Sequence, residues 1–327
     1  MGLAWPRSLV WEVTPRCPLR CGHCYCIWSA AGAELPEELD TGVLLHVLQA
    51  LAPTRRHLQA LTFSGGEPLL REDLGELVRS TGQVLPRAQL TVATSGWFLD
   101  SGRAEELARE GVSVVQLTLL AAHPELHDLL TGRGGSFERT LAAIPAACGA
   151  GLRVAVFFVA MRANIHELPG VARLAVALGA DTVVLNRFQP GGRGLDGWRS
   201  RTPTREQLGW ALAQRRELQD RAGLQLGTPI PPCEGGAAMP CPVGTRNAYP
   251  ALGPDGTLRH CNHSPRVAGS LLDRPLAELL GEPCMQPVTP TDLPGECTGC
   301  HHARSCRGGC LAASRQTGGG IYHGVSA

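Results

Sequence analysis

The stretch of sequence that decides the fold is Cys17-Pro-Leu-Arg-Cys21-Gly-His-Cys24, which directly follows the strand-like run Leu9-Val-Trp-Glu-Val13. Three thiolates with this spacing can bind three irons of a [4Fe-4S] cube and leave the fourth iron open for another ligand. An open coordination position is typical of catalytic metal sites, whereas structural sites are closed. A short run of cysteines is also compatible with a zinc knuckle or with structural thiols, so the motif needs support from elsewhere in the chain.

A second motif, Ser64-Gly-Gly-Glu-Pro68, follows the next strand-like run, residues 60–63. Glycines let a backbone approach a ligand closely, and a carboxylate can bind an ammonium group. Alone, this motif is compatible with an ordinary turn. In this order and at this spacing, the two motifs together resemble the signature of the radical S-adenosylmethionine (SAM) superfamily.

The resemblance implies a SAM site at the ends of the strands. Cys17, Cys21 and Cys24 would hold a [4Fe-4S] cluster whose open iron binds the amino and carboxylate groups of SAM. Residues that follow or end the second, third and fourth strand-like runs would make further contacts: Gly65, Gly66, Glu67, Thr94, Ser95 and Thr118. The glycines and the glutamate would meet the methionyl ammonium, and the Thr-Ser pair would lie near the ribose. The last of these positions has a strand role as its alternative, because the aspartate that often follows it in relatives is absent here.

The chemistry that the resemblance implies is carried by the cofactor. An electron from the reduced cluster cleaves SAM into methionine and a 5′-deoxyadenosyl radical, which removes hydrogen from an unactivated C–H bond. The protein would orient the reactants and exclude water. A reducing partner of the flavodoxin or ferredoxin type is expected to supply the electron.

Short β-like runs alternate with helical patterns through about the first 190 residues, which is typical of βαβ units and a parallel sheet. The candidate strands are residues 9–13, 60–63, 90–94, 114–118, 154–159 and 182–185. The candidate helices between them are residues 42–51, 71–80, 103–110, 137–148 and 166–178. This pattern predicts an α/β fold, a partial (β/α)6 TIM-like barrel over residues 1–195, with ligands at the carboxyl ends of the strands.

The rest of the chain changes character. Residues 196–232 read as a linker that contains a polar, arginine-rich helix over residues 204–221. Residues 233–327 are rich in Pro, Gly and Cys and show little periodicity. A segment this poor in apolar residues needs metals to hold its shape, so we expect a small, cysteine-rich C-terminal domain stabilised by clusters.

The C-terminal segment carries a second cysteine pattern, Cys297-x2-Cys300-x5-Cys306-x3-Cys310, preceded by Gly256-x4-Cys261. It resembles the SPASM domain, an extension of many radical SAM enzymes that holds auxiliary iron-sulfur clusters. A zinc ribbon is the alternative, although iron-sulfur is favoured beside a radical SAM core. The resemblance implies one or two auxiliary clusters.

The ligands implied for the first auxiliary cluster are Cys233, Cys241, Cys261 and Cys310, and those for the second are Cys297, Cys300 and Cys306. The family usually supplies one more cysteine after the last of the motif, and this sequence has none. His323 is the candidate replacement, unless the position is open or the site is vacant. The remaining thiols are expected to be structural: Cys26, Cys148 and Cys284.

Length and composition agree with an enzyme that contacts neither nucleic acid nor membrane. The chain has 327 residues, 43% of them hydrophobic, and a formal net charge of only +1. No apolar run approaches the roughly 20 residues of a membrane span, and the N-terminus lacks the pattern of a signal peptide. We therefore expect a cytoplasmic protein, in which 13 cysteines indicate metal binding rather than disulfides.

The sequence contains arginine throughout but no lysine. A lysine is required for a pyridoxal phosphate Schiff base and for a lysine nucleophile. Its absence excludes aminomutase chemistry that uses that cofactor.

The leading functional hypothesis is an oxidative maturase that modifies a peptide or protein side chain by forming a thioether, a carbon-carbon crosslink or a related product. It follows from the SPASM resemblance, because the best-known members of that group act on peptides. Auxiliary clusters would take up the electron left on the substrate. A separate peptide-recognition protein is expected as a partner, since no recognition domain precedes residue 9.

Two alternatives remain open. The first is oxidation or decarboxylation of a small molecule, as in heme-maturation relatives that share a Gly-Arg-Gly-type loop like the one around Arg193. An arginine at this position could bind a substrate carboxylate with two hydrogen bonds. The second is a non-catalytic zinc or iron-sulfur scaffold, which would bind no SAM.

Overall fold

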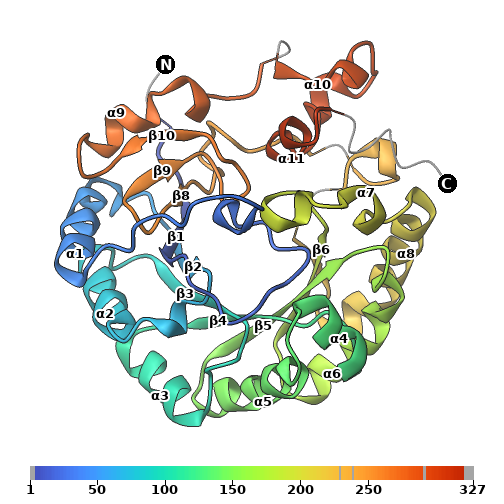
Figure 1. Ribbon diagram of the computed structural model, residues 1–327, viewed down its shortest axis with the longest axis horizontal. Helices are drawn as coiled ribbons and strands as arrows, with labels where there is room; N and C mark the ends of the chain where they lie inside the picture. The colour runs from blue at the N-terminus through green and yellow to red at the C-terminus, as the bar shows by residue number, and fades with distance from the viewer. Residues whose placement is uncertain (1–3, 228–229, 238, 290–291, 320–327) are drawn as a thin grey trace.

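The computed structural model describes residues 4–227, 230–237, 239–289 and 292–319. One ten-stranded sheet runs through these residues in the order β10-β9-β8-β1-β2-β3-β4-β5-β6-β7. The strands curve around a central space, and helices cover the outer side of the sheet (Figure 1).

The first six strands lie in chain order, and each pairs in parallel with the next. They are β1 (Ser8–Thr14), β2 (Ala60–Gly65), β3 (Gln89–Thr94), β4 (Val114–Thr118), β5 (Arg153–Ala160) and β6 (Thr182–Arg187). Each contains one of the predicted strand-like runs, so the predicted partial (β/α)6 barrel is confirmed.

The helices of the barrel connect these strands and follow the last of them. They are α1 (Thr41–Ala50), α2 (Leu74–Val84), α3 (Ser101–Glu110), α4 (Pro124–Thr131), α5 (Ser136–Gly149), α6 (Leu168–Ala177), α7 (Trp198–Arg201) and α8 (Arg205–Ala222). The side chains of Asp40 and Asp100 cap α1 and α3 by accepting backbone N–H hydrogen bonds. The short helix α4 is not among the predicted helices, because eight residues show too little apolar periodicity.

The main core lies between the strands and the helix layer. Trp11 of β1 and Phe63 of β2 are fully buried, and their rings stack with centroids 5.9 Å apart. Leu44 of α1 and Leu77 of α2 pack into the same core and have no exposed surface. A parallel sheet buried in this way leaves polar chemistry to the loops at the strand ends.

The linker and the C-terminal segment add short elements to the two edges of the sheet. β7 (Gln225–Leu226) pairs in parallel with β6, and β8 (Ala251–Leu252) pairs in parallel with β1. The strands β9 (Thr257–Arg259) and β10 (Val267–Ser270) continue the sheet in antiparallel pairing. The helices that follow are α9 (Leu276–Leu280), α10 (Ala303–Cys306) and α11 (Leu311–Gln316).

These additions join the C-terminal segment to the barrel. Arg259 of β9 forms a buried ion pair with Glu12 of β1, and Ala313 of α11 packs with Phe188 and Trp198. The sequence pattern does not predict these strands, because runs of two to four residues show no measurable period. Across the described ranges, no helix is long and apolar enough to span a bilayer.

Candidate active site

The three cysteines of the first motif lie on one loop, residues 15–26, which leaves the carboxyl end of β1 and is called the cluster loop below. Burial raises the pKa of Cys21, and the nearby charges of Cys24 and Cys17 raise it further. Burial raises the pKa of Cys17 to about 12, whereas hydrogen bonding with Cys26 lowers that of Cys24 to about 6. The donor set fits the predicted iron-sulfur cluster, which thiolates bind.

The cluster loop is held from two sides by backbone contacts. Arg193, in the 3₁₀ turn η5 (Gly192–Leu195), donates to the carbonyl oxygen of Cys21 over 3.1 Å. The N–H of Gly194 donates to the carbonyl of Cys24 over 3.0 Å. On the other side, the N–H of Gly22 donates to Leu130 in α4 over 3.2 Å. The cluster loop is thus fixed by η5 and α4, two elements of the partial barrel that lie far from it in the sequence.

The glycines of the second motif are explained by close packing against the cluster loop. A Cβ on Gly65 would lie 2.3 Å from the carbonyl oxygen of Thr14, and one on Gly66 would lie 2.1 Å from that of Arg16. Gly65 also has a φ of +126°, which disfavours other residues. The N–H of Gly66 donates to Thr14 over 2.7 Å. The close approach that these glycines allow is therefore one between two backbone segments at the strand ends.

Glu67 joins the ends of β2 and β3. Its carboxylate is fully buried and accepts hydrogen bonds from the Thr94 hydroxyl at 2.6 Å, the Ser95 N–H at 2.8 Å and the Ser95 hydroxyl at 2.5 Å. Burial raises the pKa of Glu67, while these hydrogen bonds act in the opposite direction. Three of the predicted SAM-contacting residues thus form one cluster, in which both carboxylate oxygens already have partners within the fold. Thr118 ends β4, is half-buried and lies outside this cluster.

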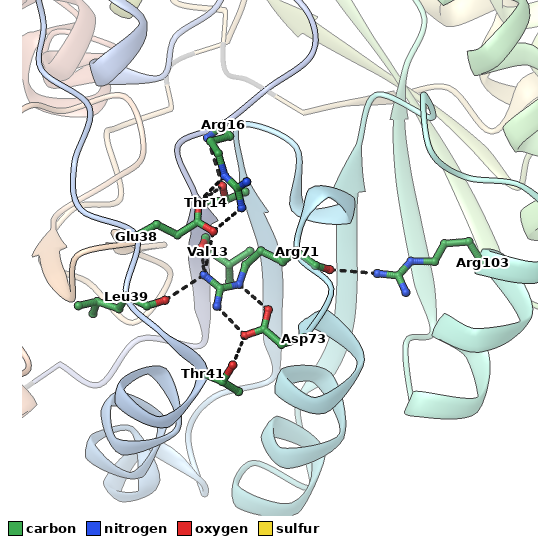
Figure 2. Close-up of polar contacts among 9 residues, drawn as sticks. All are labelled: Val13, Thr14, Arg16, Glu38, Leu39, Thr41, Arg71, Asp73 and Arg103. Carbon is green, nitrogen blue, oxygen red and sulfur yellow. Dashed lines mark hydrogen bonds and ion pairs between the residues drawn. The ribbon is translucent and has the colours of Figure 1, made fainter.

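A polar network below the cluster loop supports the end of β1 (Figure 2). Arg71 is 5% exposed and donates to the carbonyls of Val13 and Leu39, each over 3.1 Å. The same guanidinium binds both carboxylate oxygens of Asp73, at 2.8 and 2.5 Å, and lies 3.4 Å from Glu38. Glu38 in turn accepts from Arg16 and Thr14 at the start of the loop. Sequence reasoning missed this network, because its members are spread over separate segments.

The C-terminal cysteines fall into two groups. Cys241, Cys261 and Cys310 line one cavity, together with Tyr249, His260 and His263. Cys297, Cys300 and Cys306 form the other group, in which burial and then the charges of Cys300 and Cys306 raise the pKa of Cys297. Among the described residues, no three His, Cys, Asp or Glu side chains are arranged to bind a single metal ion.

The predicted grouping of Cys233 with Cys241, Cys261 and Cys310 stays a prediction. Cys233 lies in η6 (Pro232–Glu234) and does not line the cavity of Cys241, Cys261 and Cys310. Burial raises the pKa of Cys233 to about 11, and the charges of Cys306 and Cys297 contribute to this increase. His323 is outside the described residues.

An aromatic stack connects the cluster loop with the auxiliary cavity. Tyr25, which follows Cys24, stacks on His263 with ring centroids 4.3 Å apart. His263 is two residues from Cys261 and lines the same cavity. Burial and nearby arginines lower the pKa of His260 to about 4, so its imidazole is neutral at pH 7. No sequence signal identified this stack, because Tyr25 lies just outside the motif and its partner is far away in the sequence.

Other polar residues near the strand ends serve the fold. Asn164 is buried, accepts from the Met161 N–H at 2.7 Å and donates to the carbonyls of Leu120 and Val159. Arg187 is buried and lies 3.3 Å from the Glu234 carboxylate. Both side chains thus have partners within the fold.

Comparison with known proteins agrees with this arrangement. The family model of the radical SAM superfamily matches residues 11–175. The mycofactocin maturase MftC of Mycolicibacterium smegmatis is 30% identical over 334 residues, which cover 97% of this chain and 81% of that protein. The PqqA peptide cyclase of Xanthomonas campestris pv. campestris is 31% identical over 93% of this chain and 82% of its own length.

Two solved structures share the fold at low sequence identity. SuiB from Streptococcus suis, bound to S-adenosylmethionine, superposes with a TM-score of 0.72 at 14% identity and covers 94% of this chain and 74% of its own. Native anSMEcpe with bound AdoMet gives a TM-score of 0.72 at 16% identity, over 95% of this chain and 91% of its own. The chain therefore belongs to the radical SAM superfamily and is an enzyme that uses SAM and a [4Fe-4S] cluster, with a SPASM-type C-terminal extension.

Proposed function

We propose that this enzyme is an oxidative maturase that removes hydrogen from a side chain of a peptide or protein and forms a thioether, a carbon-carbon crosslink or a related product. The observation that carries the proposal is the Tyr25–His263 stack, which places the auxiliary thiol cavity directly beside the cluster loop. The site that starts radical chemistry then lies next to a site that can accept an electron. This arrangement suits a reaction that ends in net oxidation.

The cofactors supply the radical chemistry when they are bound: reductive cleavage of SAM yields a 5′-deoxyadenosyl radical that takes a hydrogen atom from the substrate. The chain's own residues position this chemistry. Cys17, Cys21 and Cys24 would hold the cluster, while Arg193 fixes the Cys21 carbonyl. The buried Glu67 holds the loop at Ser95 against β2, which orients the strand ends toward SAM.

The peptide substrate class is supported by two relatives. PqqA peptide cyclase acts, by its name, on a peptide, and MftC is named a maturase. Both similarities extend over more than nine-tenths of this chain, so they include the C-terminal segment as well as the barrel. A one-electron donor of the flavodoxin or ferredoxin type and a separate peptide-recognition protein complete the proposal.

The small-molecule alternative loses the feature that favoured it. The hypothesis assigned Arg193 to a substrate carboxylate, but its guanidinium is already engaged with the Cys21 carbonyl at 3.1 Å. Its backbone N–H also donates to the Ser29 hydroxyl at 3.0 Å. The arginine therefore has a positioning role for the cluster loop.

The test begins with anaerobic reconstitution of the full chain with iron and sulfide. Wild-type protein should form 5′-deoxyadenosine from SAM, and the variant Cys17→Ala/Cys21→Ala/Cys24→Ala should form none while losing about four irons per chain, because one cube is removed. Any short peptide encoded beside the gene is the first candidate substrate to test. Mass spectrometry should show that it loses two hydrogens or forms a crosslink.

Two outcomes would contradict this proposal. A variant without the three cysteines that still cleaves SAM would place the cluster elsewhere. A wild-type enzyme that cleaves SAM and oxidises a small metabolite, while leaving the peptide unmodified, would replace the peptide maturase with the small-molecule alternative.

A further inference from the structure

Three arginines beside the cluster loop carry charges that the fold does not neutralise. Arg133 follows α4, Arg139 lies in α5, and Arg20 belongs to the cluster loop itself. The N–H of Arg20 donates to the carbonyl of Thr131 at the end of α4 over 2.9 Å, which places this residue beside the α4–α5 junction. In the part of the chain that the structure describes, none of the three guanidiniums forms an ion pair.

Trp97, in the loop after β3, brings two of these arginines together. The guanidinium carbon of Arg133 lies 3.7 Å from the centroid of the Trp97 ring, and that of Arg139 lies 5.6 Å from it. Contacts between a cation and an aromatic ring hold an arginine in place and leave its charge intact. Arg133 and Arg139 are therefore ordered cations at one place on the surface.

The carboxylates of α4 and α5 do not cancel this charge. Asp128 accepts hydrogen bonds from the N–H groups of Gly135 and Phe137, at 2.6 and 2.8 Å, so it serves the start of α5. Glu125 lies at the other end of α4, and Glu138 is the remaining acidic residue of the two helices. One exposed glutamate leaves a net positive charge beside three arginines.

Exposed apolar side chains accompany the arginines. Leu129, in the last turn of α4, is 74% exposed, and Phe98, directly after Trp97, is 39% exposed. Large apolar side chains that gather on a surface mark interaction sites, and interfaces are enriched in aromatic residues and arginine. We call Arg20, Phe98, Leu129, Arg133 and Arg139 the arginine surface.

The arginine surface is connected to the cluster loop by a short route. The Arg133 guanidinium donates to the carbonyl oxygen of Pro18 over 2.8 Å, and Pro18 directly follows the cluster ligand Cys17. One hydrogen bond and the backbone of a single residue therefore separate this surface from a ligand of the cluster. A protein that docks there needs no access to the interior of the barrel in order to pass an electron to the cluster.

We propose that the arginine surface docks the one-electron donor, a protein with an acidic surface around its redox group. The donor loses one electron and the cluster gains it, with no bond or proton exchanged. This inference rests on the proposed function, which includes such a donor. Electrostatic complementarity would speed the encounter and orient the partner, as a transient electron-transfer complex requires. A peptide substrate must instead reach the SAM site at the strand ends, whereas α4 and α5 belong to the outer helix layer (Figure 1).

The experiment measures docking and electron entry on the reconstituted full chain, with flavodoxin as the acidic donor. The variant is Leu129→Gln/Arg139→Glu, and Arg133 stays unchanged because it also holds the Pro18 carbonyl. Calorimetry at low salt should show flavodoxin binding at least about tenfold weaker than in wild type, because an apolar contact is lost and a charge is reversed. The difference should shrink at high salt, which screens exposed charges. Cluster reduction by reduced flavodoxin, followed by stopped-flow absorbance, should slow by a similar factor.

The matched control is Arg87→Glu, which makes the same charge change before β3, at the opposite end of the strands. Arg87 is also exposed and forms no ion pair within the described ranges, so this variant should bind flavodoxin as wild type does. Unchanged binding in Leu129→Gln/Arg139→Glu would overturn the inference. Equal weakening in Arg87→Glu would overturn it as well, because net charge alone would then attract the donor.

Excess dithionite bypasses docking, so SAM cleavage driven by it should be the same in wild type and in Leu129→Gln/Arg139→Glu. A loss of this cleavage in the variant would overturn the inference, since the two side chains would then act on the cluster itself. A variant that cleaves SAM with dithionite but no longer modifies the peptide would assign the surface to the peptide or its recognition protein. A wild type that neither flavodoxin nor a ferredoxin reduces would also refute the docking site.

Peptide modification with dithionite distinguishes failure of this inference from failure of the proposed function. If docking fails the test while dithionite-driven wild type still modifies the peptide, only the donor site is refuted. If docking passes and no peptide is modified, the maturase proposal fails and the donor site stands.

Discussion

The cluster loop and the C-terminal segment present their cysteines in opposite ways. Three thiols of the cluster loop come from eight consecutive residues, and backbone hydrogen bonds to η5 and α4 hold that loop. The cavity thiols of the C-terminal segment come from positions 241, 261 and 310, between strands and helices of only a few residues. The apolar cluster beside these thiols is small: Val243, Val288 and Leu311. Residues 251–285 of the same segment instead pack into the main core.

This difference indicates which part of the site keeps its structure in the absence of metal. A loop fixed by the barrel keeps its shape before any metal binds, because its hydrogen bonds join it to well-packed strands and helices. Segments with few apolar contacts gain most of their folding free energy from the metal. We therefore expect the barrel to survive loss of the clusters and the C-terminal segment to depend on them.

Removing all clusters should produce the largest effect. Metal binding contributes on the order of 10 kcal/mol to folding in small metal-held domains, so the last part of the C-terminal segment, after residue 288, should open in the stripped protein. Limited trypsin digestion is informative because the chain has no lysine and trypsin cuts only at arginine. Cleavage after the exposed Arg304 should become at least about tenfold faster, as its rate follows the population of the open form.

The exposed Arg87, between α2 and β3, is the matched control. Its cleavage should keep the same rate with and without clusters, because the barrel does not need them. Equal acceleration at both arginines would erase the difference between the two regions.

Breaking the polar network below the cluster loop should give the next largest effect. Arg71→Leu leaves Asp73 and Glu38 without their buried cation and the carbonyls of Val13 and Leu39 without donors. Loss of one partner of a buried pair costs about 3–5 kcal/mol, which urea unfolding can measure. The comparison is Arg315→Ala in the C-terminal segment, where the ion pair with Asp292 is partly exposed and should contribute no more than about 1 kcal/mol.

The sequence predicts the barrel better than it predicts the C-terminal segment. The six barrel strands were predictable because each is an apolar run bounded by loops, and the cluster loop because its three thiols lie close in sequence. The ligand groups of the C-terminal segment came from the family resemblance alone, since the cavity collects Cys241, Cys261 and Cys310 from positions up to 69 residues apart. Arg193 could not be placed either, because its partner Cys21 is 172 residues away.

Lowering the pH should decrease the free energy of unfolding of the barrel, because His127 is buried as a neutral imidazole. Burial lowers the pKa of His127 to about 4, and its Nδ1 accepts a hydrogen bond from the Leu120 N–H at 3.2 Å, which requires the neutral ring. The unfolded chain binds the proton near pH 6.5, so stability is complete above that pH and falls as the pH drops toward 4. Between pH 7 and pH 5 this histidine should remove about 2 kcal/mol from the free energy of unfolding.

The check is urea unfolding of wild type and His127→Gln at both pH values. Glutamine does not titrate, so the variant should lack this part of the pH dependence although it starts less stable. Identical pH dependence in the two proteins would show that His127 does not titrate differently in the folded and unfolded states.

The smallest expected effect tests whether the cluster loop needs its contact with η5. Arg193→Met removes the hydrogen bond to the Cys21 carbonyl and a positive charge that favours the thiolates of Cys17 and Cys24. Outer-shell partners of metal ligands affect metal affinity or activity by about tenfold or more, so SAM cleavage should slow about tenfold. The midpoint potential of the cluster should fall as well, because less positive charge remains near it. Arg193→Lys should restore the potential but not the hydrogen-bond geometry. If Arg193→Met instead leaves SAM cleavage and the potential unchanged, the other contacts hold the cluster loop without Arg193. The loop would then depend on its backbone hydrogen bonds alone.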